Sequence, residues 1–125
     1  MLIDETRDIH GVRVLVCADT GPQLANEGDA NTFLSLAWEQ NANLVAIPVL
    51  RLADDFFRLR TGLAGQVIQK FVNYRLRLAV VGDIDRWAAQ SAPLRDFVSE
   101  ANRGRDVWFI ASIAELETRL LSQRS

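Results

Sequence analysis

The sequence predicts a single α/β domain over residues 1–125, built on a mainly parallel β-sheet with an antiparallel edge strand. Three observations favour this class. Apolar, largely β-branched runs recur along the chain, and the segments between them carry apolar residues at helical spacing. Such an alternation is typical of a parallel sheet covered by helices on both faces. The chain has 125 residues, 49% of them hydrophobic, so it can bury a core without disulfides or metal.

Five strands are expected, and turn residues mark their ends. They cover residues 2–7, Val12–Ala18, Leu44–Val49, Leu76–Val81 and Val107–Ala111. The first is expected to pair antiparallel with the second across a turn at 8–11. Pro48 lacks an N–H, so the third strand ends there or has an exposed side. Gly82 stops the fourth strand.

Four helices are expected between and after the later strands. The first follows a polar loop over 20–29, with Asp29 as its N-cap, and runs to Gln40, where Asn41 ends it in the left-handed conformation. The second covers 61–74. Ser91 with Pro93 opens the third, Gly104 closes it, and Ser112 to Glu115 form a capping box for the last.

Aromatic residues on these elements are expected mainly in the core. Trp38 and Tyr74 fall on the apolar faces of the first two helices, and Trp108 lies in the last strand. Trp87 lies in a loop, where it is a candidate contact residue for a partner. Phe56 and Phe57 are partner-contact candidates if they are exposed, and core residues otherwise.

Charge and composition narrow the class of function. The net charge is −2, so the basic surplus of a general nucleic-acid binder is missing. A single cysteine, Cys17, fits a reducing compartment. The first residues do not resemble a signal peptide, and no apolar run is long enough to cross a bilayer. We therefore expect a cytoplasmic protein that acts on neither nucleic acid nor membrane.

Catalytic and cofactor motifs do not stand out in this sequence. It contains no P-loop, dinucleotide-binding or nucleophile-elbow pattern, so no cofactor and no catalytic residue is predicted. His10 belongs to the expected hairpin turn, at the other end of the sheet from the strand-following loops, and Cys17 lies inside an apolar strand. Carboxylates follow several expected strands, at Asp19, Asp83 and Asp85. An alternative is therefore a divalent-metal or small-molecule site where the parallel strands end, which could also serve a hydrolase.

The segment from Arg58 to Gly65 is the most informative candidate site. Thr61 is placed to cap a helix whose first turn contains Gly62, and the small residues let an anion approach free backbone N–H groups. Arg58 and Arg60 add positive charge. The segment therefore predicts either a phosphate site, bound or attached at Thr61, or an ordinary helix cap.

Two long stretches carry a family resemblance. FFRLRTGLAGQVIQKFVNYRLRLAVVGD (56–83) and LRDFVSEANRGRDVWFIAS (94–112) closely resemble a bacterial family named domain of unknown function DUF4180. The likeness covers nearly the whole chain. It implies no activity.

A more distant likeness is to STAS domains, typified by anti-sigma-factor antagonists. These have the order β-β-α-β-α-β-α-β-α and carry a D-S-S-G-L-G-type turn in which a partner kinase phosphorylates a serine. RTGLAG (60–65) takes the corresponding place here, so the resemblance implies that Thr61 is the modified hydroxyl. Thr replaces Ser, no Asp precedes it, and Ala64 is inserted before the second glycine.

The leading hypothesis is a non-catalytic regulatory domain that binds a protein partner through the Thr61 helix and adjoining loops, under phosphorylation control. The metal or small-molecule site is the second hypothesis. A homodimer held by an exposed apolar helix face is the third.

Overall fold

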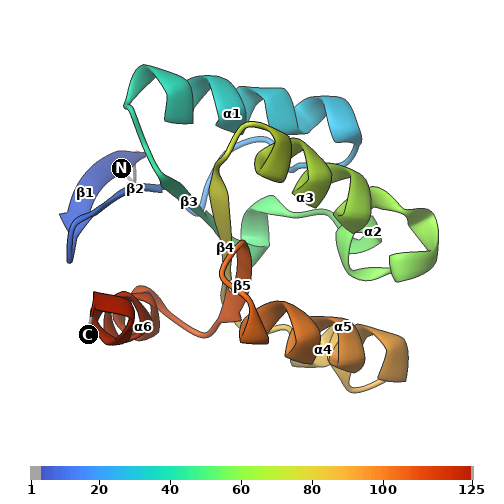
Figure 1. Cartoon of the computed structure of the whole chain (residues 1–125). Helices are drawn as coiled ribbons and strands as arrows, with labels where there is room; N and C mark the ends of the chain where they lie inside the picture. The colour runs from blue at the N-terminus through green and yellow to red at the C-terminus, as the bar shows by residue number, and fades with distance from the viewer. Residues whose placement is uncertain (1–3, 125) are drawn as a thin grey trace.

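Five strands form one sheet in the order in which they follow along the chain (Figure 1). The structure, a computed structural model, describes residues 4–124. The strands are β1 (Glu5–Ile9), β2 (Val12–Val16), β3 (Leu44–Pro48), β4 (Arg77–Val81) and β5 (Val107–Ile110). β1 runs antiparallel to β2, and β2 to β5 are parallel to one another. The predicted fold class is therefore confirmed.

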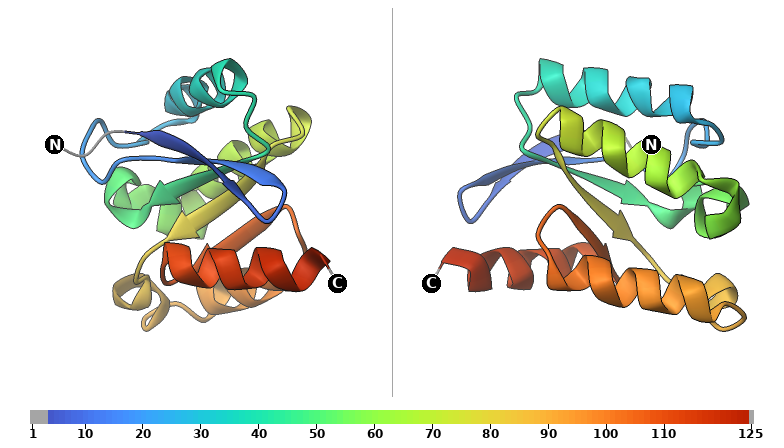
Figure 2. Two further views of the ribbon diagram at one scale, coloured as in Figure 1. Left: turned by 90° about the vertical axis from the view of Figure 1, so that its left-hand side faces the viewer. Right: turned by 45° about the vertical axis from the view of Figure 1, so that its right-hand side comes forward.

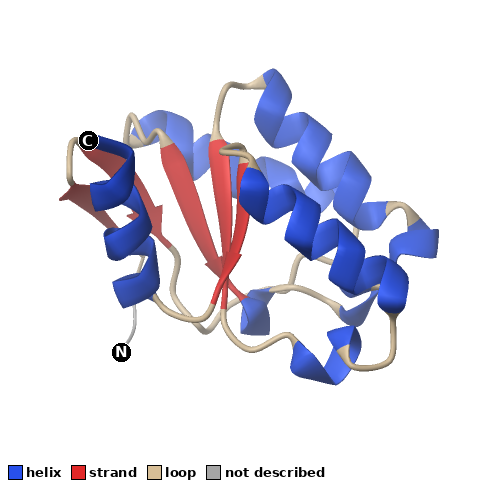
Figure 3. Cartoon of the chain, turned by 60° about the horizontal axis from the view of Figure 1, so that its bottom comes forward, coloured by secondary structure: helices blue, strands red, loops and turns tan. Residues whose placement is uncertain are grey.

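The helices cover the two faces of the sheet unequally. The long ones are α1 (Ala30–Glu39), α3 (Leu63–Asn73), α5 (Ala92–Arg103) and α6 (Ile113–Arg124). Right-handed crossovers that all step in one direction leave their helices on one face. Figure 3 shows α1, α3 and α5 on one side of the strands and α6 on the other. In Figure 2, α6 lies across the sheet beside the β1–β2 hairpin, where Arg7 of β1 contacts Glu117 at 2.7 Å.

Short helices fill the connections at the carboxyl edge of the sheet, meaning the edge where the parallel strands end. They are α2 (Asp54–Phe57) and α4 (Asp85–Ala88), with 3-10 turns η1 (Glu27–Asp29), η2 (Val49–Arg51) and η3 (Leu59–Thr61). No helix or strand was expected from the sequence over residues 50–60. They form most of η2, α2 and η3, and the last two build one wall of the site described below.

Alternating residues of the central strands point into two separate cores. Toward α1, α3 and α5, the buried strand residues include Ile47, Leu78 and Phe109. Toward α6, the small side chains of Ala46 and Ala79 lie in the same cluster as Leu116 and Leu120 of that helix. Small residues at the centre of this face let a single helix pack close to the sheet. Both faces of a parallel sheet are thus covered, as the continuous apolar strands predict.

Trp108 and Trp38 illustrate a confirmed and a wrong core prediction. Trp108 is 2% exposed, and Arg77 and Arg119 lie over its ring, 4.6 and 4.1 Å from the ring centre. Trp38 is 78% exposed, and Tyr74 is 65% exposed. The expected placement of both was wrong, because the buried stripe of α1 ends at Ala37 and Tyr74 lies just beyond the last turn of α3.

The turns also differ in detail from the sequence-based expectation. The hairpin turn is only His10-Gly11, both at positive φ, so β1 extends to Ile9; residues 2–3 of the expected first strand lie outside the described residues. Asp29 occupies the predicted N-cap position of α1, but its side chain makes no cap hydrogen bond to that helix. Its carboxylate instead accepts from the backbone N–H groups of Ala25 and Asn26, and Asn26 caps the preceding turn η1. The cap predicted at Ser91 and the left-handed Asn41 are confirmed.

Candidate functional site

A pocket of about 700 Å³ opens at the carboxyl edge of the sheet, between the segments that follow β3 and β4. We call it the carboxyl-edge pocket. It lies between α2 and η3 on one side and α4 with the start of α5 on the other. Its lining includes Asp54, Phe57, Arg58, Arg60, Arg86 and Trp87. The pocket therefore brings together four candidate residues named from the sequence: Phe57, Arg58, Arg60 and Trp87.

One wall of this pocket is an aromatic pair held by a carboxylate. The rings of Phe57 and Trp87 stack with centres 4.1 Å apart and planes 17° apart. Asp54 Oδ1 accepts hydrogen bonds from Trp87 Nε1 at 3.2 Å and from Arg86 Nη2 at 3.3 Å. The Arg86 guanidinium also lies 4.5 Å from the Trp87 ring centre. These contacts fix the half-buried indole as a flat surface toward the pocket.

Phe56 and Phe57 are core residues, which settles the alternative that the sequence left open. They are 1% and 2% exposed and contact each other edge to face at 5.3 Å. Phe57 reaches the pocket only as the floor beneath Trp87. In this conformation a partner can contact Trp87 directly, whereas Phe56 is inaccessible to it.

Positive charge exceeds negative charge in the pocket lining. Arg58, Arg60 and Arg86 line it together with a single carboxylate, Asp54, which is already bonded to Arg86 and Trp87. Arg58 lies 3.6 Å from Asp55, and both side chains are more than half exposed. Among the described residues, Arg60 has no hydrogen-bond or ion-pair partner. The pocket can therefore attract an anion and still offer it an uncommitted guanidinium.

Thr61 lies beside this pocket and stabilises the turn between η3 and α3. Its hydroxyl can donate to the carbonyl oxygen of Asp55 at 2.7 Å or of Arg58 at 2.8 Å, and it accepts from the N–H of Leu63 at 3.2 Å. The N-cap position predicted for Thr61 is occupied by Gly62, at φ 78°. The residue thus acts one position earlier than expected, as a local anchor of the helix start.

The glycines of this helix start leave open space, as their small size suggests. A side chain added at Gly62 or Gly65 would meet nothing within 4 Å. Both line a shallow groove along α3 that also contains Glu27 and Lys70. The carboxylate of Glu27 opposes an anion in that groove, so the carboxyl-edge pocket is the better anion site.

The structure does not bring the aspartates considered as metal ligands together into one group. Asp83 Oδ1 accepts from the backbone N–H of Asp85 at 2.8 Å, which stabilises the start of α4. Asp19 lines a separate cavity of about 100 Å³ beside the ends of β2 and β3. Within residues 4–124, no three His, Cys, Asp or Glu side chains form a group that could hold a metal ion.

The thiol and the imidazole are far from forming a nucleophilic pair. Burial, with a smaller contribution from the Asp4 carboxylate, raises the pKa of Cys17 to about 12, so the thiol stays protonated at neutral pH. His10 lies in the hairpin turn at the opposite end of β2. In the part of the chain that is described, no helix has the length and apolar character needed to span a membrane.

The pairing of Arg86 with Asp54 in the pocket was not predicted from the sequence. The two residues are 32 positions apart in the sequence and meet only because β3 and β4 are neighbours. The signal that could have found Arg86 is its place beside Trp87 in a strand-following loop, where α/β sheets bind ligands.

Comparison with known proteins places the chain in a family. No curated protein and no solved structure matches it, so the likeness to STAS domains stays a prediction. A family model described as "Domain of unknown function (DUF4180)" matches residues 9–120, which is nearly the whole chain. The match confirms the resemblance carried by residues 56–83 and 94–112, and the chain belongs to the DUF4180 family.

Proposed function

We propose that this domain is a non-catalytic regulatory module that binds an acidic or phosphorylated segment of a partner protein in the carboxyl-edge pocket. The observation that carries the proposal is the meeting of Arg58, Arg60 and Arg86 around the stacked Phe57–Trp87 pair. An arginine fork suits carboxylate and phosphate oxygens, and an ordered indole offers rigid contact area to a peptide.

A protein segment fits these features better than a nucleic acid does. The chain carries a net charge of −2, so the positive charge is local to the pocket and not spread over a face that could follow a phosphate backbone. The pocket is bounded by two chain segments, and Trp87 of α4 lines it, which suits a short stretch of side chains. The acidic group is expected to pair with Arg60, which needs to give up no existing partner.

Thr61 gives this interaction a route to phosphorylation control. Modification would remove the hydroxyl proton that Thr61 donates to Asp55 or Arg58, whereas its oxygens could still accept from the N–H of Leu63. The added phosphate would stand beside Arg58 and Arg60 and compete with an acidic partner for both. Phosphorylation is therefore expected to weaken binding of the partner and to remove the Thr61 donor bond to the segment before α3.

The test first uses the domain as bait in a lysate of its own organism and identifies the captured proteins by mass spectrometry. The affinity of the domain for the purified partner is then measured by calorimetry. Arg60→Glu is expected to weaken binding at least about tenfold, because it places a repelling charge in the pocket. Arg103→Glu is the matched control, since Arg103 is an exposed arginine on α5 paired with Glu100 at 3.1 Å.

Two Thr61 variants separate the switch from the helix anchor. Thr61→Glu adds the negative charge, whereas Thr61→Val removes only the hydroxyl. If phosphorylation control operates, Thr61→Glu weakens binding well beyond Thr61→Val. Equal affinities of Thr61→Glu and Thr61→Val for the partner would contradict the phosphorylation switch. A partner that binds Arg60→Glu as tightly as Arg103→Glu would contradict binding in the carboxyl-edge pocket.

A further inference from the structure

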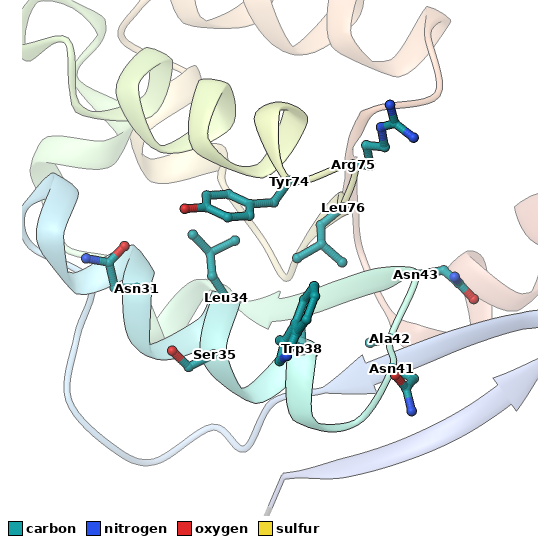
Figure 4. Close-up of a pocket in the computed structure, with 11 residues that line it drawn as sticks. Asn31, Leu34, Ser35, Trp38, Asn41, Ala42, Asn43, Tyr74, Arg75 and Leu76 are labelled. Atoms are coloured by element: carbon teal, nitrogen blue, oxygen red, sulfur yellow. The ribbon is translucent and has the colours of Figure 1, made fainter.

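A second cavity, of about 540 Å³, lies at the amino end of the parallel strands, between the C-terminal ends of α1 and α3 (Figure 4). We call it the aromatic cavity. α1 and α3 run side by side over the same face of the sheet (Figure 2). The cavity is thus at the opposite edge of the sheet from the carboxyl-edge pocket, and the two share no lining residue.

Exposed aromatic side chains form the walls of this cavity over an apolar floor. Trp38 is 78% and Tyr74 65% exposed, although neither contributes to the core. In Figure 4, Trp38, Tyr74, Leu34 and Leu76 converge on one space from α1 and from the end of α3. Leu34 and Ala42, which both line the cavity, are buried. Water in this cavity therefore contacts apolar surface that a ligand could cover.

The backbone that carries these walls is held by two equivalent helix ends. Asn41 after α1 and Arg75 after α3 both take the left-handed conformation, at φ 54° and 58°. The next residue in each case bonds back into its helix, Ala42 N–H to Ala37 and Leu76 N–H to the carbonyl of Phe71, both at 2.9 Å. This Schellman arrangement fixes the turn at each end. The cavity is consequently formed before any ligand arrives.

The charges around the cavity favour an uncharged ligand. Among the described residues, no acidic side chain lines it, so a cation would have no carboxylate partner. The C-terminal ends of two helices carry partial negative charge, which opposes an anion and attracts a cation. Two positive groups at the rim offset that attraction: Arg75 lines the cavity with its guanidinium pointing away from it in Figure 4, and Lys70 donates to the lining Asn31 at 2.9 Å.

Neutral hydrogen-bonding groups remain at the rim. The Ser35 hydroxyl, the Trp38 indole N–H and the Tyr74 hydroxyl have no hydrogen-bond partner within residues 4–124. They can serve a polar substituent on a ring without adding charge. A few such groups around an apolar, aromatic lining are characteristic of small-molecule pockets, whose volumes span about 300–1,000 Å³.

We propose that the aromatic cavity is a binding site for an uncharged, ring-bearing small molecule. The ring would lie between Trp38 and Tyr74 on the floor formed by Leu34 and Leu76, with a polar substituent toward the rim. The proposal is independent of the partner-binding role of the carboxyl-edge pocket, because the two sites differ in place, charge and lining.

The test titrates the ¹⁵N-labelled domain with phenol and records two-dimensional NMR spectra. Benzoate and benzylamine, which present a similar ring with a negative or positive charge, are the matched probes. Phenol is expected to shift the Trp38 indole N–H resonance with millimolar affinity, and each charged probe to bind at least about tenfold more weakly. The Trp87 and Trp108 indole resonances should not move.

Variants tie the shift to the cavity. Trp38→Ala is expected to fold, because the side chain is mostly exposed, and to weaken phenol binding at least about tenfold. Leu50→Ala is the control, since Leu50 is an exposed apolar residue (66%) outside the cavity. Equal binding of charged and neutral probes, or undiminished phenol binding to Trp38→Ala, would overturn the proposal. Resonances of the cavity that shift with protein concentration alone would also overturn it, because they would show that a second copy of the chain covers the cavity.

Discussion

Replacing Arg51 by methionine tests how the carboxyl-edge loop after β2 is held. Arg51 is 7% exposed and has no carboxylate partner within the described residues. Its guanidinium donates to three carbonyl oxygens, those of Pro22 at 2.9 Å, Ala18 at 3.0 Å and Thr20 at 3.2 Å. It also lies 5.1 Å from the Phe33 ring centre. One side chain thus holds the loop over residues 18–22.

The expected loss is about 3 kcal/mol of unfolding free energy. A hydrogen bond from a charged donor contributes roughly 1.5–3 kcal/mol, but water can reach the carbonyls of the exposed Thr20 and Pro22 in the variant. Methionine keeps the packing of the aliphatic stem and avoids burying a charge, which further reduces the loss. For a domain of this size, about 3 kcal/mol lowers the melting temperature by roughly 10 °C.

Urea denaturation followed by circular dichroism measures this difference, with Arg103→Met as the control at an exposed arginine. A loss below about 1 kcal/mol would show that water replaces all three contacts, and the loop would then not depend on Arg51. A large loss in the Arg103→Met control would mean that removing any arginine charge destabilises the domain, and the loss at Arg51 could then not be assigned to its hydrogen bonds.

Two further predictions concern buried groups. The Asn102 amide accepts from the N–H of Phe109 in the edge strand β5 at 2.7 Å and donates to its carbonyl oxygen at 3.2 Å. Asn102→Ala should therefore lower the unfolding free energy by about 2 kcal/mol, measured by urea denaturation. Because the edge strand loses this contact, the variant should also aggregate more, measured by light scattering. Burial raises the pKa of Cys17 from 9.0 to about 12, so above pH 9.0 the unfolded chain releases a proton that the folded one keeps. The unfolding free energy should therefore fall as the pH rises through this range, and Cys17→Ala should abolish that part of the slope; an unchanged slope would contradict the assignment.

Local signals in the sequence predicted most of the fold. The strand runs and the caps at Ser91 and Ser112 need only neighbouring residues, and the structure confirms them: Leu94 N–H bonds to Ser91 Oγ and Glu115 N–H to Ser112 Oγ, both at 3.2 Å. Hydrophobic periodicity also predicted the buried faces of the strands. It misplaced Trp38, because periodicity marks a stripe of a helix without showing how much of that stripe the neighbouring elements cover.

Part of the candidate site was also visible in the sequence. Arg58 and Arg60 were predicted because they add positive charge beside the helix start at Thr61, and Trp87 because it lies in an expected loop. The partnership of Asp54 with Arg86 and Trp87 was not predictable, since it depends on which loops become neighbours. The aromatic cavity was hidden for the same reason: its two walls come from different helices that pack together.

The sequence by itself determined the class of fold, the position of each main element and the absence of a general nucleic-acid charge pattern, because these follow from spacing, composition and short-range hydrogen bonding. Only the tertiary structure decided that three arginines line one pocket and that Trp38 and Tyr74 line a second cavity together. It also decided that the predicted metal ligands Asp19, Asp83 and Asp85 form no common group. The physical reason is that strand order and helix packing set distances between residues remote in sequence. Burial energy, which sets that packing, is shared among many side chains and is not encoded at any one position.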